Sequence, residues 1–359
     1  MISDNDSSAI AELVRRGQQT INGSPEAGAF NLHGVRTRTE TNSQEVARAL
    51  VEFMRAFPGS DEDEPDIRVH LFTVDTLDET MGTVPSDAVM LYDWGKVRIY
   101  HKGPLRYLEV DTRARVVADV EQRVLAGFAE KELLQSDWLV TNLFFYPLWG
   151  QLLKESGLFP LHAAGLVKDG RSCLFLGRSG SGKSTLTVQL VKSGYGLLSD
   201  DTVFLREKDG MVEALSFPEE INVTEQTVRL IPELSRVQNF TVNELRDKSS
   251  FSIEELYPDC VVDSSLPALM VFPEIAEVET TTSAPMSRTE ALALAMRYGY
   301  FFLDPSTTGR HFEILSLLAR QTSCYHLYSG SNQEDLGQVI DGLLTASLER
   351  DQSSGERKE

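Results

Sequence analysis

Nine consecutive residues, 177–185, have the types and spacing of a phosphate-binding loop. They read GRSGSGKST and satisfy the pattern G-x-x-x-x-G-K-S/T. Gly177, Gly180 and Gly182 allow the backbone to turn tightly and to direct successive N–H groups at an oxyanion. Lys183 can then reach the β- and γ-phosphates, and the Ser184 hydroxyl can complete a Mg²⁺ coordination shell. The loop therefore predicts that the chain binds a nucleoside triphosphate.

The segments on both sides of this loop supply the context that the motif requires. An apolar run at 173–176 indicates a strand before the loop, and residues 185–192 have the pattern of a helix after it. Such a helix adds the positive end of its dipole to the phosphate site. The residues expected to hold the nucleotide are Gly177, Arg178, Ser179, Gly180, Ser181, Gly182, Lys183, Ser184 and Thr185.

Two adjacent carboxylates, Asp200 and Asp201, follow the next apolar segment, 195–198. That segment indicates a buried strand, which would deliver both side chains to the mouth of the loop site. Adjacent side chains of a strand point to opposite sides, so we expect two different roles. One carboxylate can hold Mg²⁺, and the other can accept the proton of an acceptor hydroxyl. The expected metal ligands are Ser184, Asp200 and Asp201.

Composition excludes several classes of protein. The chain has 359 residues, of which 41% are hydrophobic and 25% charged, enough for two domains with cores of their own. No apolar run reaches the length of a membrane span, and residues 139–153 predict a buried helix. The net charge of −20 argues against a nucleic-acid partner. Three widely spaced cysteines, Cys173, Cys260 and Cys324, fit reduced thiols in a cytoplasmic protein.

The pattern of elements predicts two domains between polar ends. We expect a loose arm over 1–28, an α+β module over 29–156, a nucleotide domain over 157–348 and a polar tail over 349–359. The module is predicted to be rich in strands (69–74, 88–92, 96–100 and 105–110), with helices at 45–57, 118–132 and 137–155. The nucleotide domain is predicted to contain strands at 161–167, 172–176, 195–198, 202–206 and 211–215 and a last helix at 334–348. Two hairpins so close to the loop are unusual for a purely parallel doubly wound sheet.

The run at 161–201, LHAAGLVKDGRSCLFLGRSGSGKSTLTVQLVKSGYGLLSDD, resembles the catalytic core of HPr kinase/phosphorylase. That enzyme phosphorylates a serine of the carrier protein HPr, and its nucleotide domain is similar to that of ATP-dependent phosphoenolpyruvate carboxykinase. The resemblance implies an α/β P-loop domain of this type, preceded here by a smaller β-rich α+β module. It also implies ATP and Mg²⁺ as cofactors, a serine-bearing protein, peptide or small molecule as acceptor, and allows a homo-oligomer.

The resemblance further implies roles for single residues. His162 lies 21 residues before Lys183, and Asp201 lies 18 residues after it, as in the family. By this likeness Asp201 is the general base, Ser184 binds Mg²⁺, and His162 lies beside the transferring phosphate. The catalytic residues expected are Asp201, His162 and Lys183. A lone histidine is also common in a purely structural role, so the sequence leaves His162 open between the two.

The chain also departs from that family. Residues 217–222, FPEEIN, stand where the enzyme has a glycine- and arginine-rich segment with a second metal carboxylate and the phosphorylase residues. Glu219 or Glu220 could replace that carboxylate, and the sequence does not decide between them. Lys248 could contact a phosphate or be a solvated loop residue. Phosphorylase activity is therefore not expected. The alternative function is a module that binds a partner under the control of ATP, without phosphoryl transfer. Carboxykinase-like chemistry on a small acid is disfavoured, because it would require several arginines around the loop and only Arg178 lies in it.

Overall fold

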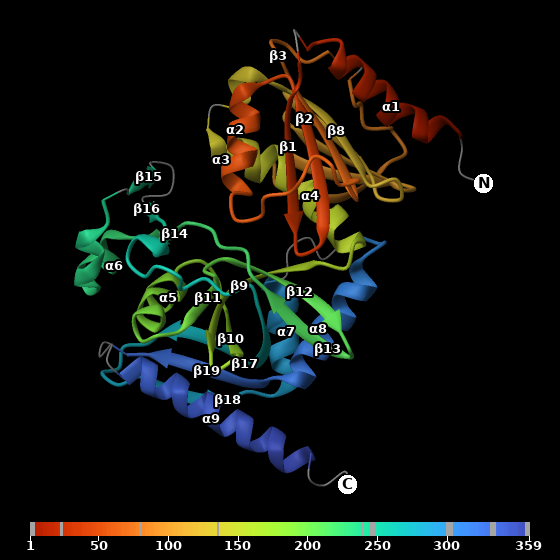
Figure 1. Ribbon diagram of the computed structural model, residues 1–359. Helices are drawn as coiled ribbons and strands as arrows, with labels where there is room; N and C mark the ends of the chain where they lie inside the picture. Colours follow the sequence, from red (N-terminus) through yellow and green to blue (C-terminus); the bar gives the residue numbers. More distant parts are fainter. Residues whose placement is uncertain are drawn as a thin grey trace. The chain divides into compact units, whose positions relative to one another are not determined.

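The computed structural model describes residues 4–21, 24–78, 81–134, 136–238, 240–243, 248–298, 304–330 and 335–355, without the side chains of 4–9, 241–243, 248 and 351–355 (Figure 1). The chain forms two compact units. Unit 1 consists of Met1–Gly157 and Leu303–Thr307, and unit 2 consists of Leu158–Phe302 and Thr308–Glu359. Five residues from the second half of the sequence thus belong to the first unit.

Unit 1 is built on an eight-stranded sheet in the order β1-β2-β3-β8-β7-β6-β5-β4. Strands β4 to β8 form an antiparallel meander, while β3 is parallel to both β2 and β8. The strands are β1 (Glu26–Leu32), β2 (Val35–Thr41), β3 (Ile67–Val74), β4 (Val89–Asp93), β5 (Val97–Lys102), β6 (Leu105–Val110), β7 (Ala114–Asp119) and β8 (Val124–Glu130).

The helices of unit 1 bury apolar stripes against this sheet and one another. Ser43 caps α2 by accepting a hydrogen bond from the Val46 backbone N–H, which satisfies one of the free donors at the helix start. The helices are α1 (Asp4–Gln18), α2 (Gln44–Phe53), α3 (Asp137–Leu139), a π-helical stretch (Val140–Phe145) and α4 (Tyr146–Glu155). The helical expectation for 137–155 is therefore confirmed.

Two expectations for unit 1 were wrong. The segment 1–28, expected as a loose arm with room for one short helix, is packed where it is described, because α1 buries Ile10 and Leu13 in a core with Phe72 and Phe128, and β1 begins at Glu26. Residues 118–132 are not a helix but the β7–β8 hairpin and its flanks. The Asp119 carboxylate accepts hydrogen bonds from the N–H groups of Glu121 and Gln122, 2.9 Å each. This Asp turn reverses the chain within a stretch whose polar residues resemble a helix surface.

A buried ion pair holds residues 304–307 within unit 1. Nη2 of Arg106 lies 2.9 Å from Oδ1 of Asp304, and the two side chains are 3% and 5% exposed. The Gln151 side-chain amide donates to the Thr307 hydroxyl at 2.9 Å. Burial of this pair is tolerated because both charges are hydrogen-bonded to each other.

Unit 2 is a mixed sheet flanked by helices. Strand β10 is parallel to β17, and β17 is parallel to β19, whereas β9 is antiparallel to β10, β11 and β12. The expected hairpins, β9–β10 and β12–β13, are both present. The strands are β9 (Phe159–Lys168), β10 (Arg171–Leu176), β11 (Gly196–Ser199), β12 (Thr202–Lys208), β13 (Met211–Leu215), β17 (Ser264–Ile275), β18 (Thr282–Pro285) and β19 (Ser323–Ser329).

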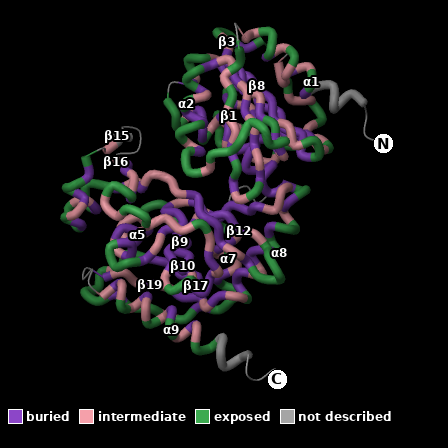
Figure 2. Tube along the Cα trace, in the orientation of Figure 1, coloured by how far each residue is buried: buried purple, intermediate pink, exposed green. Residues whose placement is uncertain are grey.

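Two apolar cores cover the two faces of this sheet. One joins α5 (Lys183–Lys192) and α9 (Asp335–Gly355) to alternate residues of the strands, and the other joins α7 (Arg288–Tyr298) and α8 (Thr308–Gln321) to the residues between them. The strands are accordingly buried along most of their length, whereas the helices carry the exposed residues (Figure 2). The last helix was expected to end at 348, and this bound was wrong, since α9 continues to Gly355 through most of the expected polar tail.

A small three-stranded sheet, in the order β14-β16-β15, follows the second hairpin along the chain. It consists of β14 (Ile221–Val223), β15 (Thr241–Asn243) and β16 (Lys248–Phe251). Along the chain, the short helix α6 (Glu225–Leu230) lies between β14 and β15. The remaining short helices are 3-10 turns at Lys131–Leu133, Pro232–Arg236 and Ile253–Glu255. Among the described residues, no helix is both long enough and apolar enough to span a bilayer.

Candidate functional site

The loop at 177–185 joins β10 to α5, so the strand and helix expected around it are present. Gly180 and Gly182 have φ values of 83° and 93°, which glycine adopts readily. A Cβ on Gly177 would lie 2.6 Å from the Ser181 Oγ, so a side chain there would collide with the loop. These three glycines therefore permit the observed path of the backbone. Arg178 and Ser179 are exposed on this loop.

Strand pairing brings His162 to the residues that follow β11. In β9, His162 is paired with Thr202 of β12, the residue next to Asp201. Nδ1 of His162 lies 2.9 Å from the backbone oxygen of Asp201 and 3.3 Å from its Oδ1. A histidine and an aspartate 39 positions apart in the sequence thus meet because their strands are neighbours.

Lys183 completes a row of three polar side chains. Its Nζ lies 3.2 Å from Nε2 of His162 and donates to the Gly177 carbonyl oxygen at 2.7 Å. The residue is only 7% exposed. The row Lys183–His162–Asp201 contains the three residues for which catalytic roles are expected.

Asp200 and Asp201 occupy different environments, as expected for adjacent residues at a strand end. The Asp201 side chain is half exposed, whereas Asp200 is 4% exposed and accepts a hydrogen bond from the Ser184 hydroxyl at 2.7 Å. Burial raises the pKa of the Asp200 carboxyl, and the charge of Asp201 adds to this effect. The structure therefore brings Ser184 and Asp200 into direct contact and leaves Asp201 beside His162.

The two glutamates that the sequence could not separate have different surroundings. Glu220 directly precedes β14 and accepts a hydrogen bond at 2.5 Å from the hydroxyl of Ser250, a residue of β16 in the small sheet. Glu219 instead lies near the aspartate pair. Burial first, and then the charges of Asp201 and Asp200, raise the pKa of Glu219 well above its ordinary range. Glu219 is therefore the third carboxylate of the site.

Two buried carboxylate oxygens of this group, Oδ1 of Asp200 and Oε2 of Glu219, lack a hydrogen bond of good geometry among the described residues, although the Thr187 and Thr202 side chains are close enough to lower the respective carboxyl pKa values. An unpartnered buried oxygen is costly unless a cation or donor satisfies it. No cluster of three or more His, Cys, Asp or Glu side chains arranged around a metal ion occurs in the described part of the chain. Mg²⁺ commonly takes only one or two carboxylates, with waters and substrate phosphates as its other ligands. The residues present fit Mg²⁺: Ser184 and Asp200, two of the three expected ligands, are able to hold it together with Glu219, whereas Asp201, the third, lies beside His162.

Two threonines not expected from the sequence, Thr224 and Thr227, connect the loop to α6. The Thr185 hydroxyl lies 3.0 Å from that of Thr227, which lies 3.2 Å from that of Thr224. Thr224 caps α6 by accepting from the Thr227 backbone N–H. An S/T/D/N residue before a short helix is the only sequence signal that could have pointed to them. The Lys248 side chain, a candidate phosphate contact, lies outside the described residues.

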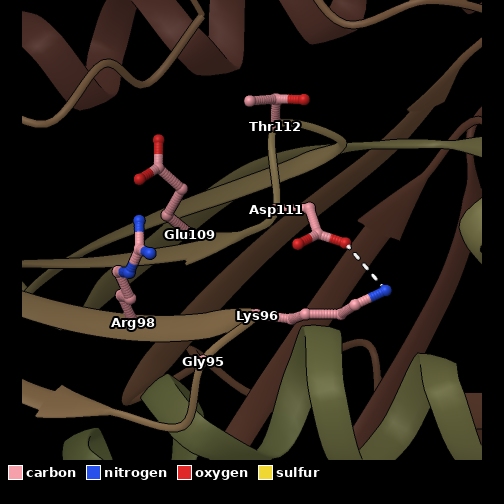
Figure 3. A pocket seen from close by; sticks show the side chains of 6 residues that line it. All are labelled: Gly95, Lys96, Arg98, Glu109, Asp111 and Thr112. Atoms are coloured by element: carbon pink, nitrogen blue, oxygen red, sulfur yellow. Dashed lines mark ion pairs between the residues drawn. The ribbon is translucent and has the colours of Figure 1, made fainter.

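A hollow of about 400 Å³ occurs in unit 1, and none of the expected site residues lines it (Figure 3). Its charged side chains are engaged with neighbours: Lys96 lies 3.6 Å from Asp111, and Arg115 lies 3.2 Å from Glu109. The residues that line it are Gly95, Lys96, Arg98, Glu109, Asp111 and Thr112. Because opposite charges are balanced within it, the hollow has no evident preference for a charged ligand.

Comparison with known proteins gives a similarity in structure but none in sequence. No protein-family profile matches the chain, and no curated protein matches it in sequence. Among solved structures, the chain is similar to the HPr(Ser) kinase/phosphatase from Coxiella burnetii. The two are 14% identical, the match covers 54% of this chain and 98% of that one, and the TM-score is 0.30. This is a weak structural relationship, too distant to assign the chain to a family.

Proposed function

We propose that the chain is an ATP-dependent kinase that transfers the γ-phosphate to a serine-type hydroxyl of a protein, peptide or small molecule. The observation that carries the proposal is the row formed by Lys183, His162 and Asp201 beside a glycine loop. The Nζ–Nε2 distance of 3.2 Å and the Nδ1–Oδ1 distance of 3.3 Å link the three side chains into one continuous row, with His162 between the loop lysine and the aspartate. No reverse phosphorylase reaction is expected.

Each group has a part in this chemistry. The loop N–H groups and Lys183 stabilise the charge on the transferred phosphoryl group. The Asp201 carboxylate takes the proton of the acceptor hydroxyl. The hydroxyl oxygen bonds to the γ-phosphorus, and the bond between that phosphorus and the oxygen that leaves with ADP breaks. General-base assistance of this kind contributes roughly 10²–10⁴ in rate. Asp201 suits the role because its side chain is half exposed and can meet an acceptor that arrives from solvent.

Ser184, Asp200 and Glu219 would hold Mg²⁺. A bound Mg²⁺ neutralises charge on the β- and γ-phosphates. The hydroxyl of Ser184 already lies 2.7 Å from Asp200, so the two oxygens need little movement to share a cation. The buried oxygens of Asp200 and Glu219, which lack a hydrogen bond of good geometry, support this assignment.

The test is transfer of label from γ-³²P ATP into a host lysate that is separated into protein, peptide and small-molecule fractions. Asp201→Asn is compared with wild type. Asp209→Asn is the matched control, because Asp209 lies in the exposed β12–β13 turn at φ 53°, a conformation that asparagine also accepts. Label that requires Asp201 but not Asp209 establishes the kinase and identifies the acceptor fraction.

The alternative outcome separates the two candidate functions. ATP binding that is unaffected by Asp201→Asn, together with no Asp201-dependent label in any fraction, would contradict the kinase. It would favour a module in which ATP controls the binding of a partner. Absence of ATP binding to the wild-type chain would exclude both.

A further inference from the structure

An exposed isoleucine ends the buried strand β17. Residues 265–273 of this strand are buried apart from a half-buried Leu266, yet Ile275 is 66% exposed. Side chains of a strand alternate, so Ile275 continues the row of Leu269, Val271 and Pro273, whose first two members belong to the core under α5. An apolar row that continues past the end of its core leaves an apolar surface open to a ligand.

This surface lies against the glycine loop. A Cβ placed on Gly182 would be 3.6 Å from Cγ1 of Ile275, and one on Gly177 would be 3.7 Å from the Pro273 carbonyl oxygen. Pairing with β19 fixes the strand end, because Ile275 is in register with Ser329 and the Ala276 N–H donates to the Ser329 carbonyl at 3.1 Å. Ile275 is thus held in position beside the loop.

The order of the strands indicates which end of a bound ATP molecule lies beside Ile275. Strand β10, which leads into the loop, has β9 on one side and β17 on the other. The β9 side carries His162 and, through its pairing with β12, is close to Asp201. If the γ-phosphate is on the side of those residues, as the proposed function requires, the nucleoside end of ATP extends to the β17 side.

The charges near Ile275 agree with a nucleoside and not with a phosphate. Glu277 and Glu279, which follow it after the strand ends, are exposed, whereas Glu274 is the adjacent residue of β17 and belongs to the other face of the sheet. Carboxylates repel phosphate oxygens but can accept hydrogen bonds from ribose hydroxyls and from a base amino group. Ligand sites commonly combine an apolar surface for a ring with a few polar groups of this kind.

We propose that Ile275 is the apolar platform on which the base of the nucleoside triphosphate packs. The proposal rests on the proposed function, since it requires the triphosphate to bind at residues 177–185. It adds a binding determinant outside the loop, on a strand that the sequence motif does not include. It commits to the base of the nucleotide as the occupant, and not to an apolar part of the acceptor.

The experiment compares two ligands that share a triphosphate but differ in the base. Affinities of the full chain for ATP and for inorganic tripolyphosphate, both with Mg²⁺, are measured by calorimetry. The variants are Ile275→Ala and Ile275→Leu, with Phe312→Ala as control. Phe312 is also exposed and apolar, but it lies on α8, which packs on the opposite face of the sheet from α5.

We expect Ile275→Ala to weaken ATP binding about tenfold, equal to about 1.4 kcal/mol, and to leave tripolyphosphate binding unchanged within about twofold. Ile275→Leu and Phe312→Ala should bind ATP as wild type does. Retained tripolyphosphate binding also shows that the variant is folded.

Three other results would overturn the inference. Unchanged ATP affinity in Ile275→Ala excludes a contact with the base. Unchanged ATP affinity together with slower phosphoryl transfer in the same variant assigns Ile275 to the acceptor site. An equal loss of both ligands means that Ile275 only supports the loop. If the wild-type chain binds neither ligand, the proposed function itself fails, and that result is distinct from the first three.

Discussion

The Nζ of Lys183 lies 3.2 Å from Nε2 of His162. An ammonium group can only donate, so Nε2 must accept, and the ring proton is then on Nδ1. Nδ1 faces the Asp201 backbone oxygen at 2.9 Å, which is a hydrogen-bond acceptor. The geometry fits a ring that donates from Nδ1 toward Asp201 and accepts at Nε2 from the loop lysine. This relay couples the loop to the carboxylate expected to take a proton.

Removal of the ring should affect turnover more than binding. We expect His162→Ala to lower the rate of phosphoryl transfer about 10- to 100-fold and to change ATP affinity less than threefold, because the ring positions Lys183 and Asp201. His326→Ala is the control, since His326 lies on β19 and contacts Glu290 at 3.3 Å. Single-turnover rates and ATP affinities check this, and equal rates in both variants would make His162 purely structural.

Loss of the loop lysine should affect both binding and transfer. Lys183→Ala removes a nearly buried charge that is directed to the phosphate loop, so ATP affinity should fall about 100-fold and transfer should be lost. Lys192→Ala, in the last turn of the same helix, removes an exposed ion pair with Glu233 and should cost less than about 1 kcal/mol of stability. ATP titration of both variants makes the comparison, and a similar loss in both would contradict a specific role for Lys183.

The two glutamates after β13 should respond differently to substitution. Glu219→Gln removes a carboxyl group whose ionisation is opposed first by burial and then by the charges of Asp201 and Asp200, so the metal-free protein should gain about 1 kcal/mol of stability. The same change should weaken Mg²⁺-dependent ATP binding about tenfold. Glu220→Gln should do neither, because that carboxylate accepts from Ser250 in the small sheet. Mg²⁺ titrations of ATP binding and chemical denaturation test both variants. A larger effect of Glu220→Gln than of Glu219→Gln would remove Glu219 from the site.

The buried ion pair in unit 1 should be sensitive to loss of one partner. Arg106→Ala leaves the Asp304 carboxylate buried without its bidentate donor, and we expect a loss of about 3–5 kcal/mol in unfolding free energy. The double variant Arg106→Met with Asp304→Leu should recover more than half of this loss, because it removes both charges. Denaturation curves of the single and double variants measure the loss and the recovery of unfolding free energy. A single variant as stable as wild type would show that the pair contributes nothing.

A buried lysine in α4 should make stability depend on pH. Burial lowers the pKa of Lys154 to about 7, against an ordinary value of 10.5, although the nearby Asp304 opposes the shift. Between pH 7 and 10.5 the unfolded chain binds a proton that the folded chain does not, so the free energy of unfolding from this group rises with pH.

The test compares Lys154→Met with wild type. Relative to that variant, wild type should gain up to about 2 kcal/mol from pH 7 to pH 9, since one proton corresponds to about 1.4 kcal/mol per pH unit. Unfolding free energies at the two pH values measure this difference. A difference that stays constant, or that falls with pH, would mean that Lys154 remains charged in the folded chain.

The sequence by itself determined the parts of the site that lie within one stretch of chain. The loop, its strand and its helix were predicted because nine adjacent residues carry the pattern and the flanking apolar periods are local. The different environments of Asp200 and Asp201 were likewise predicted, since alternation along a strand is a local property. The β7–β8 hairpin was misread because the polar residues of its turn also fit a helix surface, and no local pattern separates the two.

Only the tertiary structure decided which distant residues meet. The pairing of β9 with β12 brings His162 to Asp201, and the register of that pairing depends on the whole sheet. The choice of Glu219 over Glu220, the position of Ile275 beside Gly182, and the burial of Asp304 against Arg106 are contacts of the same kind. Each joins residues far apart in the chain, so it depends on long-range packing that no local spacing of residue types records.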